Sequence, residues 1–135
     1  MYNGQSAYRE QRLARMRALR ESGRDPYGAA FARSGRLAEV RAAFEEGGDV
    51  RIAGRLAAVR DMGKSVFADL ADATGKFQVY AQKNVLGEEA FAAFKLLDPG
   101  DIIGVRGSLF TTRQGEPTVK AASWMMLSKS LRPPP

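Results

Sequence analysis

Hydrophobic and polar residues alternate with a period of two from Val50 to Leu127, a pattern typical of β-strands that bury one face. Turn-forming residues and one helical segment divide this region into five predicted strands. The last strand is expected over residues 118–127. The residues predicted to face the core in the first four strands are Val50, Ile52, Leu56 and Ala58, then Val66, Ala68 and Leu70, then Phe77, Val79 and Ala81, then Ile103, Val105 and Leu109.

Apolar residues recur at helical spacing in three other segments. One segment, 88–97, separates the third and fourth strands and ends at Asp98-Pro99-Gly100. Another covers residues 37–46 and ends at Gly47-Gly48. The third covers residues 8–20, which contain neither glycine nor proline. The apolar residues on these helices are Phe91, Phe94 and Leu97, then Leu37, Val40 and Phe44, then Leu13, Met16 and Leu19.

Three strands, a helix and two more strands follow the order of an OB-fold, a five-stranded and partly open barrel. We therefore predict a mainly β fold with some α structure: an OB-fold barrel with a helix between strands 3 and 4, preceded by N-terminal helices. The expected divisions are a helical extension over residues 1–48, the barrel over 49–130 and the start of a linker over 131–135. The proline-rich tail Leu131-Arg132-Pro133-Pro134-Pro135 cannot join a sheet.

The chain contains no cysteine and no histidine. This excludes disulfide scaffolds, zinc sites that use Cys or His, cysteine nucleophiles and Ser-His-Asp triads. Carboxylate-bound magnesium is not excluded by composition, but no compact acidic cluster stands out. No apolar run approaches the roughly 20 residues that span a bilayer, and the N-terminus lacks a signal-peptide pattern. We therefore expect a cytoplasmic protein with no membrane partner.

The formal net charge is +6 and the sequence pI is about 10.0, which favours a polyanionic partner. Much of this charge lies near the N-terminus. As a phosphate-contacting arm, these side chains would strengthen RNA binding without reading sequence, and as a solvated helix surface they would do nothing further. The arginines concerned are Arg9, Arg12, Arg15, Arg17, Arg20 and Arg24.

Strand alternation directs Phe67 and Gln78 to the outer face, because their neighbours in sequence face the core. The same alternation directs Tyr80 to the outer face. An aromatic ring can stack on an unpaired base, and an amide offers a donor and an acceptor to a base edge. The alternative is that Phe67 packs beneath the N-terminal helices and Gln78 is an ordinary surface residue.

Arg60 stands at the end of the first strand, where a guanidinium could donate to a base carbonyl. Simple alternation would point it into the core, so either a bulge re-aims it or the strand has already ended. Alternation directs Arg55 outward, and Arg55 is therefore the alternative candidate for contact with a base. Glu116 lies in the predicted turn 113–116 and is unusual in a basic chain that is expected to bind RNA. An acceptor-only group can select a base that presents an N–H, or it can be a solvated turn acid.

At these residues the sequence resembles the N-terminal, anticodon-binding domain of class II lysyl-tRNA synthetases over nearly its whole length. Aspartyl and asparaginyl enzymes share the first-hairpin pattern but not the final junction. The segments that carry the resemblance are Asp25-Pro26-Tyr27, Leu37-Ala38-Glu39-Val40-Arg41, Ala53-Gly54-Arg55, Arg60-Asp61-Met62-Gly63-Lys64, Phe67-Ala68-Asp69-Leu70, Gly75-Lys76-Phe77-Gln78-Val79-Tyr80, Asp98-Pro99-Gly100-Asp101 and Leu127-Ser128-Lys129-Ser130-Leu131-Arg132-Pro133.

The resemblance implies a role for each candidate. Phe67 would stack on the central uridine of the lysine tRNA anticodon, and Gln78 and Arg60 would hydrogen-bond that base. Glu116 would help to read the first base. The resemblance thus favours Arg60 over Arg55.

The resemblance also implies a parent ligase that uses ATP and magnesium and acts as a homodimer. The sequence stops at the junction and lacks the class II motifs, and Pro134-Pro135 departs from the usual leucine-proline. We therefore expect no catalytic residue, cofactor or enzymatic activity in this fragment. Two other functions stay open: a sequence-tolerant single-strand binder, against which Glu116 and the scarcity of other outward aromatics argue, and a structural or protein-interaction module.

Overall fold

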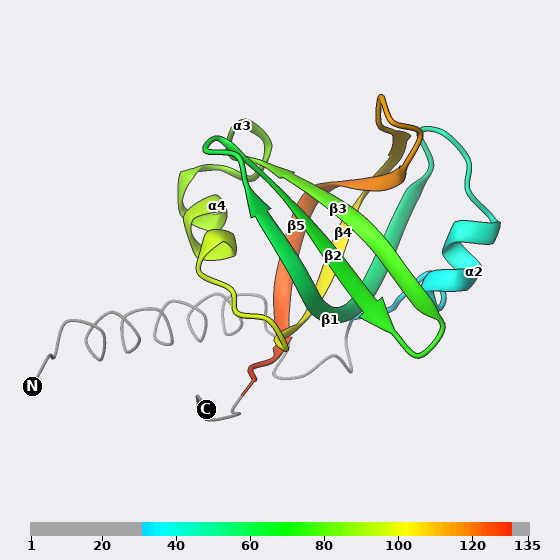
Figure 1. The fold of residues 1–135 in the computed structure, drawn as a ribbon, viewed down its shortest axis with the longest axis horizontal. Helices are drawn as coiled ribbons and strands as arrows, with labels where there is room; N and C mark the ends of the chain where they lie inside the picture. The colour runs from blue at the N-terminus through cyan, green and yellow to red at the C-terminus, as the bar shows by residue number, and fades with distance from the viewer. Residues whose placement is uncertain (1–30, 131–135) are drawn as a thin grey trace, which may run out of the picture.

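The computed structural model describes residues 31–130 (Figure 1), so the predicted helix over residues 8–20 and the tail lie outside the described residues. Five strands form a closed barrel in the order β1-β2-β3-β5-β4. The strands are β1 (Asp49–Asp61), β2 (Ser65–Asp72), β3 (Gly75–Gln82), β4 (Ile102–Thr111) and β5 (Pro117–Ser128).

The strand pairing gives the barrel the topology of an OB-fold. The long strand β1 pairs antiparallel with both β2 and β4, and β4 pairs antiparallel with β5. The barrel closes through a short parallel pairing of β3 with β5, in which Gln78 lies opposite Thr118. Two helices, α3 (Lys83–Leu86) and α4 (Glu88–Lys95), connect β3 to β4. The predicted fold class is confirmed.

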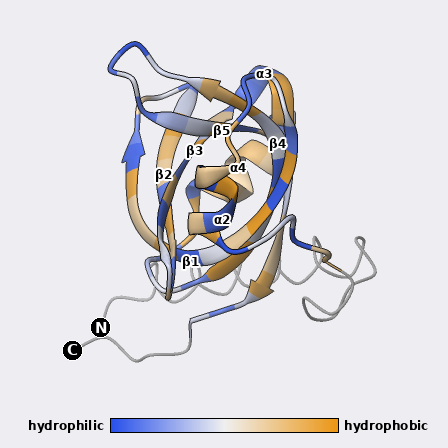
Figure 2. Ribbon diagram, turned by 90° about the vertical axis from the view of Figure 1, so that its right-hand side faces the viewer, coloured by the Kyte–Doolittle hydropathy of each residue, from blue (hydrophilic) through white to orange (hydrophobic). Residues whose placement is uncertain are grey.

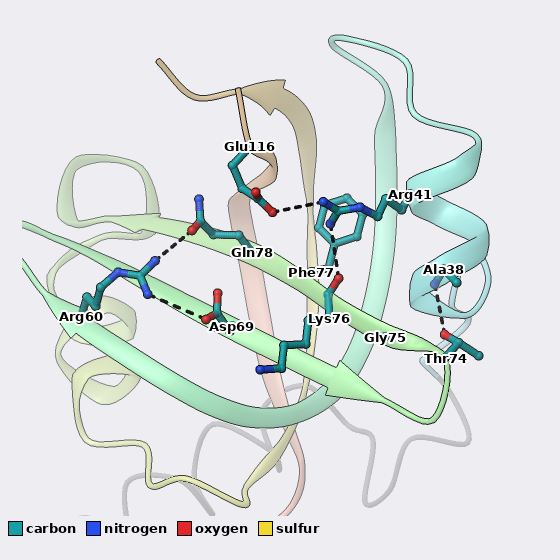
Figure 3. A pocket seen from close by; sticks show the side chains of 10 residues that line it. All are labelled: Ala38, Arg41, Arg60, Asp69, Thr74, Gly75, Lys76, Phe77, Gln78 and Glu116. Carbon is teal, nitrogen blue, oxygen red and sulfur yellow. Dashed lines mark hydrogen bonds and ion pairs between the residues drawn. The ribbon is translucent and has the colours of Figure 1, made fainter. Parts of the chain in front are cut away.

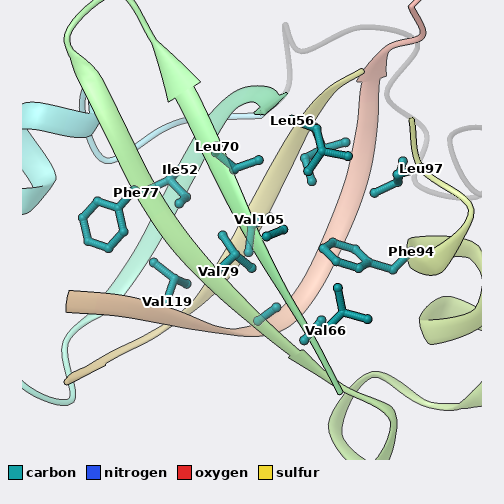
Figure 4. Close-up of a cluster of buried hydrophobic side chains, with 14 of the residues drawn as sticks. Ile52, Leu56, Val66, Leu70, Phe77, Val79, Phe94, Leu97, Val105 and Val119 are labelled. Carbon is teal, nitrogen blue, oxygen red and sulfur yellow. The ribbon is translucent and has the colours of Figure 1, made fainter. Parts of the chain in front are cut away.

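The barrel core contains nearly every side chain that the alternation placed there (Figure 4). Hydrophilic and hydrophobic segments alternate along the strands in Figure 2. Helix α4 and helix α2 (Leu37–Ala42) lie at opposite ends of the barrel (Figure 1), and both contribute buried apolar residues. Each large side chain so buried stabilises the fold by about 1.5–3 kcal/mol relative to its exposed state. The fully or nearly fully buried helix residues are Leu37, Val40, Phe91, Ala93 and Phe94, and Leu97, just after α4, is buried with them.

The apolar spacing predicts a helix that ends at residue 46, but helix α2 ends at Ala42. The chain after it is drawn into pairing with β4. The Gly47 N–H donates to the Leu109 carbonyl at 2.8 Å, and the Leu109 N–H donates to the Gly48 carbonyl at 2.8 Å. These tertiary bonds replace the last helical turn, and Phe44 still packs partly against the core. The short helix α3 has no counterpart among the predicted elements.

A buried ion pair fixes the end of β5 to the loop before β4. Asp101 is completely buried, and the Nζ of Lys129, whose side chain is 13% exposed, lies 2.9 Å from its Oδ2. The backbone N–H groups of Asp98 and Ser130 also donate to this carboxylate, at 2.8 and 2.9 Å. Lys129 directly follows β5, so this pair anchors the end of that strand.

Helix α2 is held by the turn between β2 and β3. The Leu37 N–H donates to Asp72 Oδ2 at 2.9 Å, and the Ala38 N–H donates to Thr74 Oγ1 at 3.1 Å. Partial burial of the Asp72 carboxyl would raise its pKa, but hydrogen bonds from the Thr74 hydroxyl and from the N–H groups of Leu37, Thr74 and Gly75 together hold the pKa below its ordinary value of 3.8.

These bonds predict an acid-sensitive contribution to stability. Because the pKa of Asp72 is lowered by folding, its contribution is present above pH 3.8 and is lost as the pH falls through the lowered value. The free energy of unfolding of Asp72→Asn, measured by urea at a series of pH values, should therefore approach that of the unsubstituted chain only as the pH falls well below 3.8. A stability difference that stays constant with pH would contradict this assignment.

Within residues 31–130, no helix is long and apolar enough to cross a membrane.

Candidate nucleic-acid interface

Phe67 and Gln78 lie on the same outer face of the barrel. Phe67 on β2 is paired with Tyr80 on β3, and Asp69, two residues along β2, is paired with Gln78. The side chains of Phe67 and Gln78 are partly exposed, whereas Ala68 and Val79 between them are buried. The outward parity predicted for both residues is therefore correct, and Phe67 is not sealed inside the barrel.

Arg60 joins this face because β1 contains a bulge. The pairing of β1 with β2 shifts between Leu56 and Ala58, so that Arg60 comes to lie opposite Phe67. Arg55 and Arg60 are separated by five positions, and alternation alone could not place both outside. The strand continues to Asp61, so of the two explanations that the sequence leaves open, the bulge is the right one.

The Arg60 guanidinium lies within reach of three groups, of which Figure 3 shows Gln78 and Asp69. Its Nη2 donates to Gln78 Oε1 at 2.8 Å, its Nη1 lies 3.7 Å from an Asp69 carboxylate oxygen, and its Cζ lies 5.8 Å from the centre of the Phe67 ring. Arg55 is also exposed but pairs with Ala71, four residues along β2 from Phe67, a separation of about 13 Å. The structure therefore groups Arg60, and not Arg55, with Phe67 and Gln78.

Hydrogen bonds fix the direction of the Gln78 amide. Arginine can only donate, so the Gln78 atom that it meets is the carbonyl oxygen. The Gln78 Nε2 then donates to Thr118 Oγ1 at 2.9 Å, and the Thr118 hydroxyl donates in turn to the backbone carbonyl of Glu116 at 3.0 Å. Thr118 is completely buried. The chain of donors thus runs in one direction, and a flipped amide would break two bonds.

This arrangement presents a defined hydrogen-bonding edge. An amide has two N–H groups and two carbonyl lone pairs, and the bonds to Arg60 and Thr118 use one of each. A guanidinium has five N–H donors, and its contacts with Gln78 and Asp69 leave others available. Arg60 and Gln78 therefore offer a donor, an acceptor and a donor in sequence. Of the four RNA bases, only uracil presents the complementary order: acceptor at O4, donor at N3 and acceptor at O2.

Glu116 lies beside this edge, in the turn between β4 and β5. Its carboxylate forms an ion pair with Arg41 of α2 at 3.4 Å, and both side chains are nearly half exposed. A depression of about 540 Å³ separates α2 from the Gln78 edge (Figure 3). Its lining residues are Ala38, Arg41, Arg60, Asp69, Thr74, Gly75, Lys76, Phe77, Gln78 and Glu116.

Sequence reasoning missed several residues of this face. Thr118 looked like an ordinary strand residue, and only the parallel pairing of β3 with β5 reveals its contact with Gln78. Arg41 was placed on a helix with no link to Glu116. Phe110 was overlooked, although its neighbour Leu109 faces the core and the parity of β4 therefore directs Phe110 outward. Among residues 31–130 there is no group of three acidic side chains arranged to hold a metal ion.

A five-stranded barrel that presents an arginine from β1, an aromatic ring from β2 and an oriented amide from β3 on one outer face has the architecture of an OB-fold nucleic-acid-binding domain. Comparison of the sequence with models of known protein families identifies the particular family. The chain belongs to the tRNA anti-codon family of OB-fold nucleic acid binding domains, whose profile matches residues 50–127.

Curated relatives extend the similarity beyond the barrel. The chain is 43% identical to lysine–tRNA ligase 2 of Methanosarcina acetivorans over 96% of its own length and 26% of that protein. It is 47% identical to the lysine–tRNA ligase of Carboxydothermus hydrogenoformans over 92% of the chain and 26% of the relative. For the enzyme of Bacillus subtilis the identity is 41%, over 92% of the chain and 27% of the relative. The chain thus spans about a quarter of the length of these relatives and corresponds to their N-terminal region.

Proposed function

We propose that this domain binds the anticodon loop of lysine tRNA and reads its central uridine. The observation that carries the proposal is the donor–acceptor–donor edge of Arg60 and Gln78 beside the Phe67 ring. The uracil would lie on Phe67 with its Watson–Crick edge toward that pair, since unpaired RNA bases are read by stacking and by their edges. Glu116 would contribute to reading the first anticodon base.

The relatives bear the name lysine–tRNA ligase, which supports a role in protein synthesis for a protein that contains this domain. In this proposal the domain supplies tRNA recognition. ATP- and magnesium-dependent attachment of lysine, and homodimer formation, belong to the rest of such a ligase. The barrel over residues 49–130 would be the recognition unit, and we expect no ligation from this chain alone.

The direct test compares two anticodon stem-loops that differ only in the central base. The domain should bind the loop with central uridine more tightly than the loop with cytidine. The amino group of cytosine would face the Arg60 donor and its N3 acceptor would face the Gln78 carbonyl oxygen, so neither hydrogen bond could form. Equal affinities would end this proposal. They would instead support sequence-tolerant binding of single strands, which the net charge of +6 and the grouping of several outward aromatic rings favour.

Thr118→Val should reduce the preference for uridine over cytidine without abolishing RNA binding. Valine keeps the shape of the buried side chain but removes the acceptor that orients the Gln78 amide. One net hydrogen bond contributes about 0.5–1.5 kcal/mol, so the ratio of the two affinities should fall about two- to ten-fold. Thr118→Ser keeps the hydroxyl and is the matched control. An unchanged ratio in the valine variant would show that Thr118 does not orient the amide.

A further inference from the structure

Three aromatic side chains form a row across the outer face of the barrel. They are Phe67 on β2, Tyr80 on β3 and Phe110 on β4, and we call them the aromatic row. The Phe67 and Tyr80 ring centres lie 4.7 Å apart with an angle of 35° between the rings, and those of Tyr80 and Phe110 lie 6.0 Å apart in an edge-on arrangement. All three side chains are partly exposed. The row therefore continues the surface that begins at Phe67.

The strand pairing shows how the row relates to the uridine-reading edge. Thr118 on β5 is paired with Gln78 on one side and with Phe110 on the other, so these three residues share one level of the sheet. Phe110 thus lies across β5 from the Gln78 amide, while Glu116 lies at the α2 end of the same face. An RNA strand with a base on Phe67 can continue over β5 toward Phe110.

A cation accompanies the row. Lys120 on β5 is exposed and is paired with Tyr80 on one side and Ser108 on the other. The parity of β5 directs Lys120 outward, because Val119 and Ala121 are buried. Aromatic rings interleaved with lysine are the combination that single-stranded nucleic acid requires, since the rings stack on bases and the cation neutralises phosphate.

We propose that Phe110 and Tyr80 form a second nucleobase site, which takes a base adjacent to the central one while Lys120 contacts the phosphate beside it. The proposal rests on the proposed function, because it assumes that the central base lies on Phe67. It adds sequence-tolerant stacking to the sequence-specific reading by Arg60 and Gln78. A purely structural Phe110 would only cover Thr118 and support the Tyr80 ring.

The test combines one substitution with missing bases. Phe110→Leu keeps apolar bulk and removes the ring, and Phe110→Tyr keeps the ring as the matched control. Each variant is titrated with the intact stem-loop and with loops that lack the base at the first or the third anticodon position. Phe110→Leu should bind the intact loop about five-fold more weakly or worse, and this loss should disappear on one of the two abasic loops. Phe110→Tyr should bind like the unsubstituted domain.

An equal loss on all three loops, or no loss on the intact loop, would overturn the second site. Thermal unfolding of Phe110→Leu, expected to match that of Phe110→Tyr closely, separates a binding defect from a folding defect. The preference for central uridine over cytidine, measured in the same titrations, separates the two proposals. If only the second site is wrong, that preference persists in the unsubstituted domain, and if the proposed function is wrong, it is absent there.

Discussion

Lys129→Ala should lower the free energy of unfolding by about 3–5 kcal/mol, because it leaves a buried carboxylate without its counterion. Asp101 is completely buried and the Lys129 side chain is 13% exposed, so in the folded chain the carboxylate is compensated by the ammonium group and not by solvent. The N–H groups of Asp98 and Ser130 would remain as the donors to Asp101. Such a loss is a large part of the roughly 5–15 kcal/mol that stabilises a typical domain.

Urea unfolding followed by circular dichroism measures this loss. Arg41→Ala is the matched control, since it breaks the ion pair with Glu116 in which the side chains are 45% and 43% exposed. An exposed pair of this kind contributes at most about 1 kcal/mol. A loss below about 1 kcal/mol for Lys129→Ala, no greater than that of the control, would show that the pair does not anchor the end of β5.

Phe67→Ala should weaken binding of the cognate anticodon stem-loop by about 5- to 150-fold, since stacking of one base on an aromatic ring contributes about 1–3 kcal/mol. The ring is the surface on which we place the central uridine, and Arg60 lies 5.8 Å from its centre. Fluorescence anisotropy with labelled stem-loops gives the dissociation constants. The barrel itself should unfold at nearly the same temperature, because Phe67 lies outside the buried core.

Two further substitutions separate stacking from apolar contact. Phe67→Leu retains apolar bulk without an aromatic face and should bind almost as poorly as the alanine variant. Phe67→Trp retains a stacking face and should bind much more tightly than either. Equal affinity in the leucine and tryptophan variants would mean that the ring does not stack on a base, and unchanged affinity in the alanine variant would place the RNA elsewhere.

The barrel could be predicted from the sequence because alternation is a local signal with a strict period. The side chain of a strand residue such as Val79 points inward or outward in alternation with those of its neighbours in sequence. The same rule correctly predicts that Phe67 and Gln78 point outward. The order of strands and helix then restricted the topology. Position 42 as the end of α2 could not be predicted, because bonds from Gly47 and Gly48 to β4 decide it.

The chemistry of the candidate site depends on long-range contacts that no local pattern contains. Whether Arg60 faces the core or solvent depends on the bulge after Leu56, and sequence alternation left that question open. The direction of the Gln78 amide depends on Thr118, which is 40 positions away and becomes a neighbour only when the barrel closes. The sequence therefore indicates which residue types could read a base, and the fold determines which donors and acceptors they present.

The most direct test of the central claim uses modified uridines at the middle position of the anticodon. A methyl group on N3 removes the donor that Gln78 Oε1 would accept, whereas a methyl group on C5 leaves the Watson–Crick edge intact. The domain should bind the stem-loop with 3-methyluridine at least about ten-fold more weakly than that with 5-methyluridine, which should match uridine itself. Equal affinity for the two methylated loops would contradict recognition of uracil by the edge that Arg60 and Gln78 present.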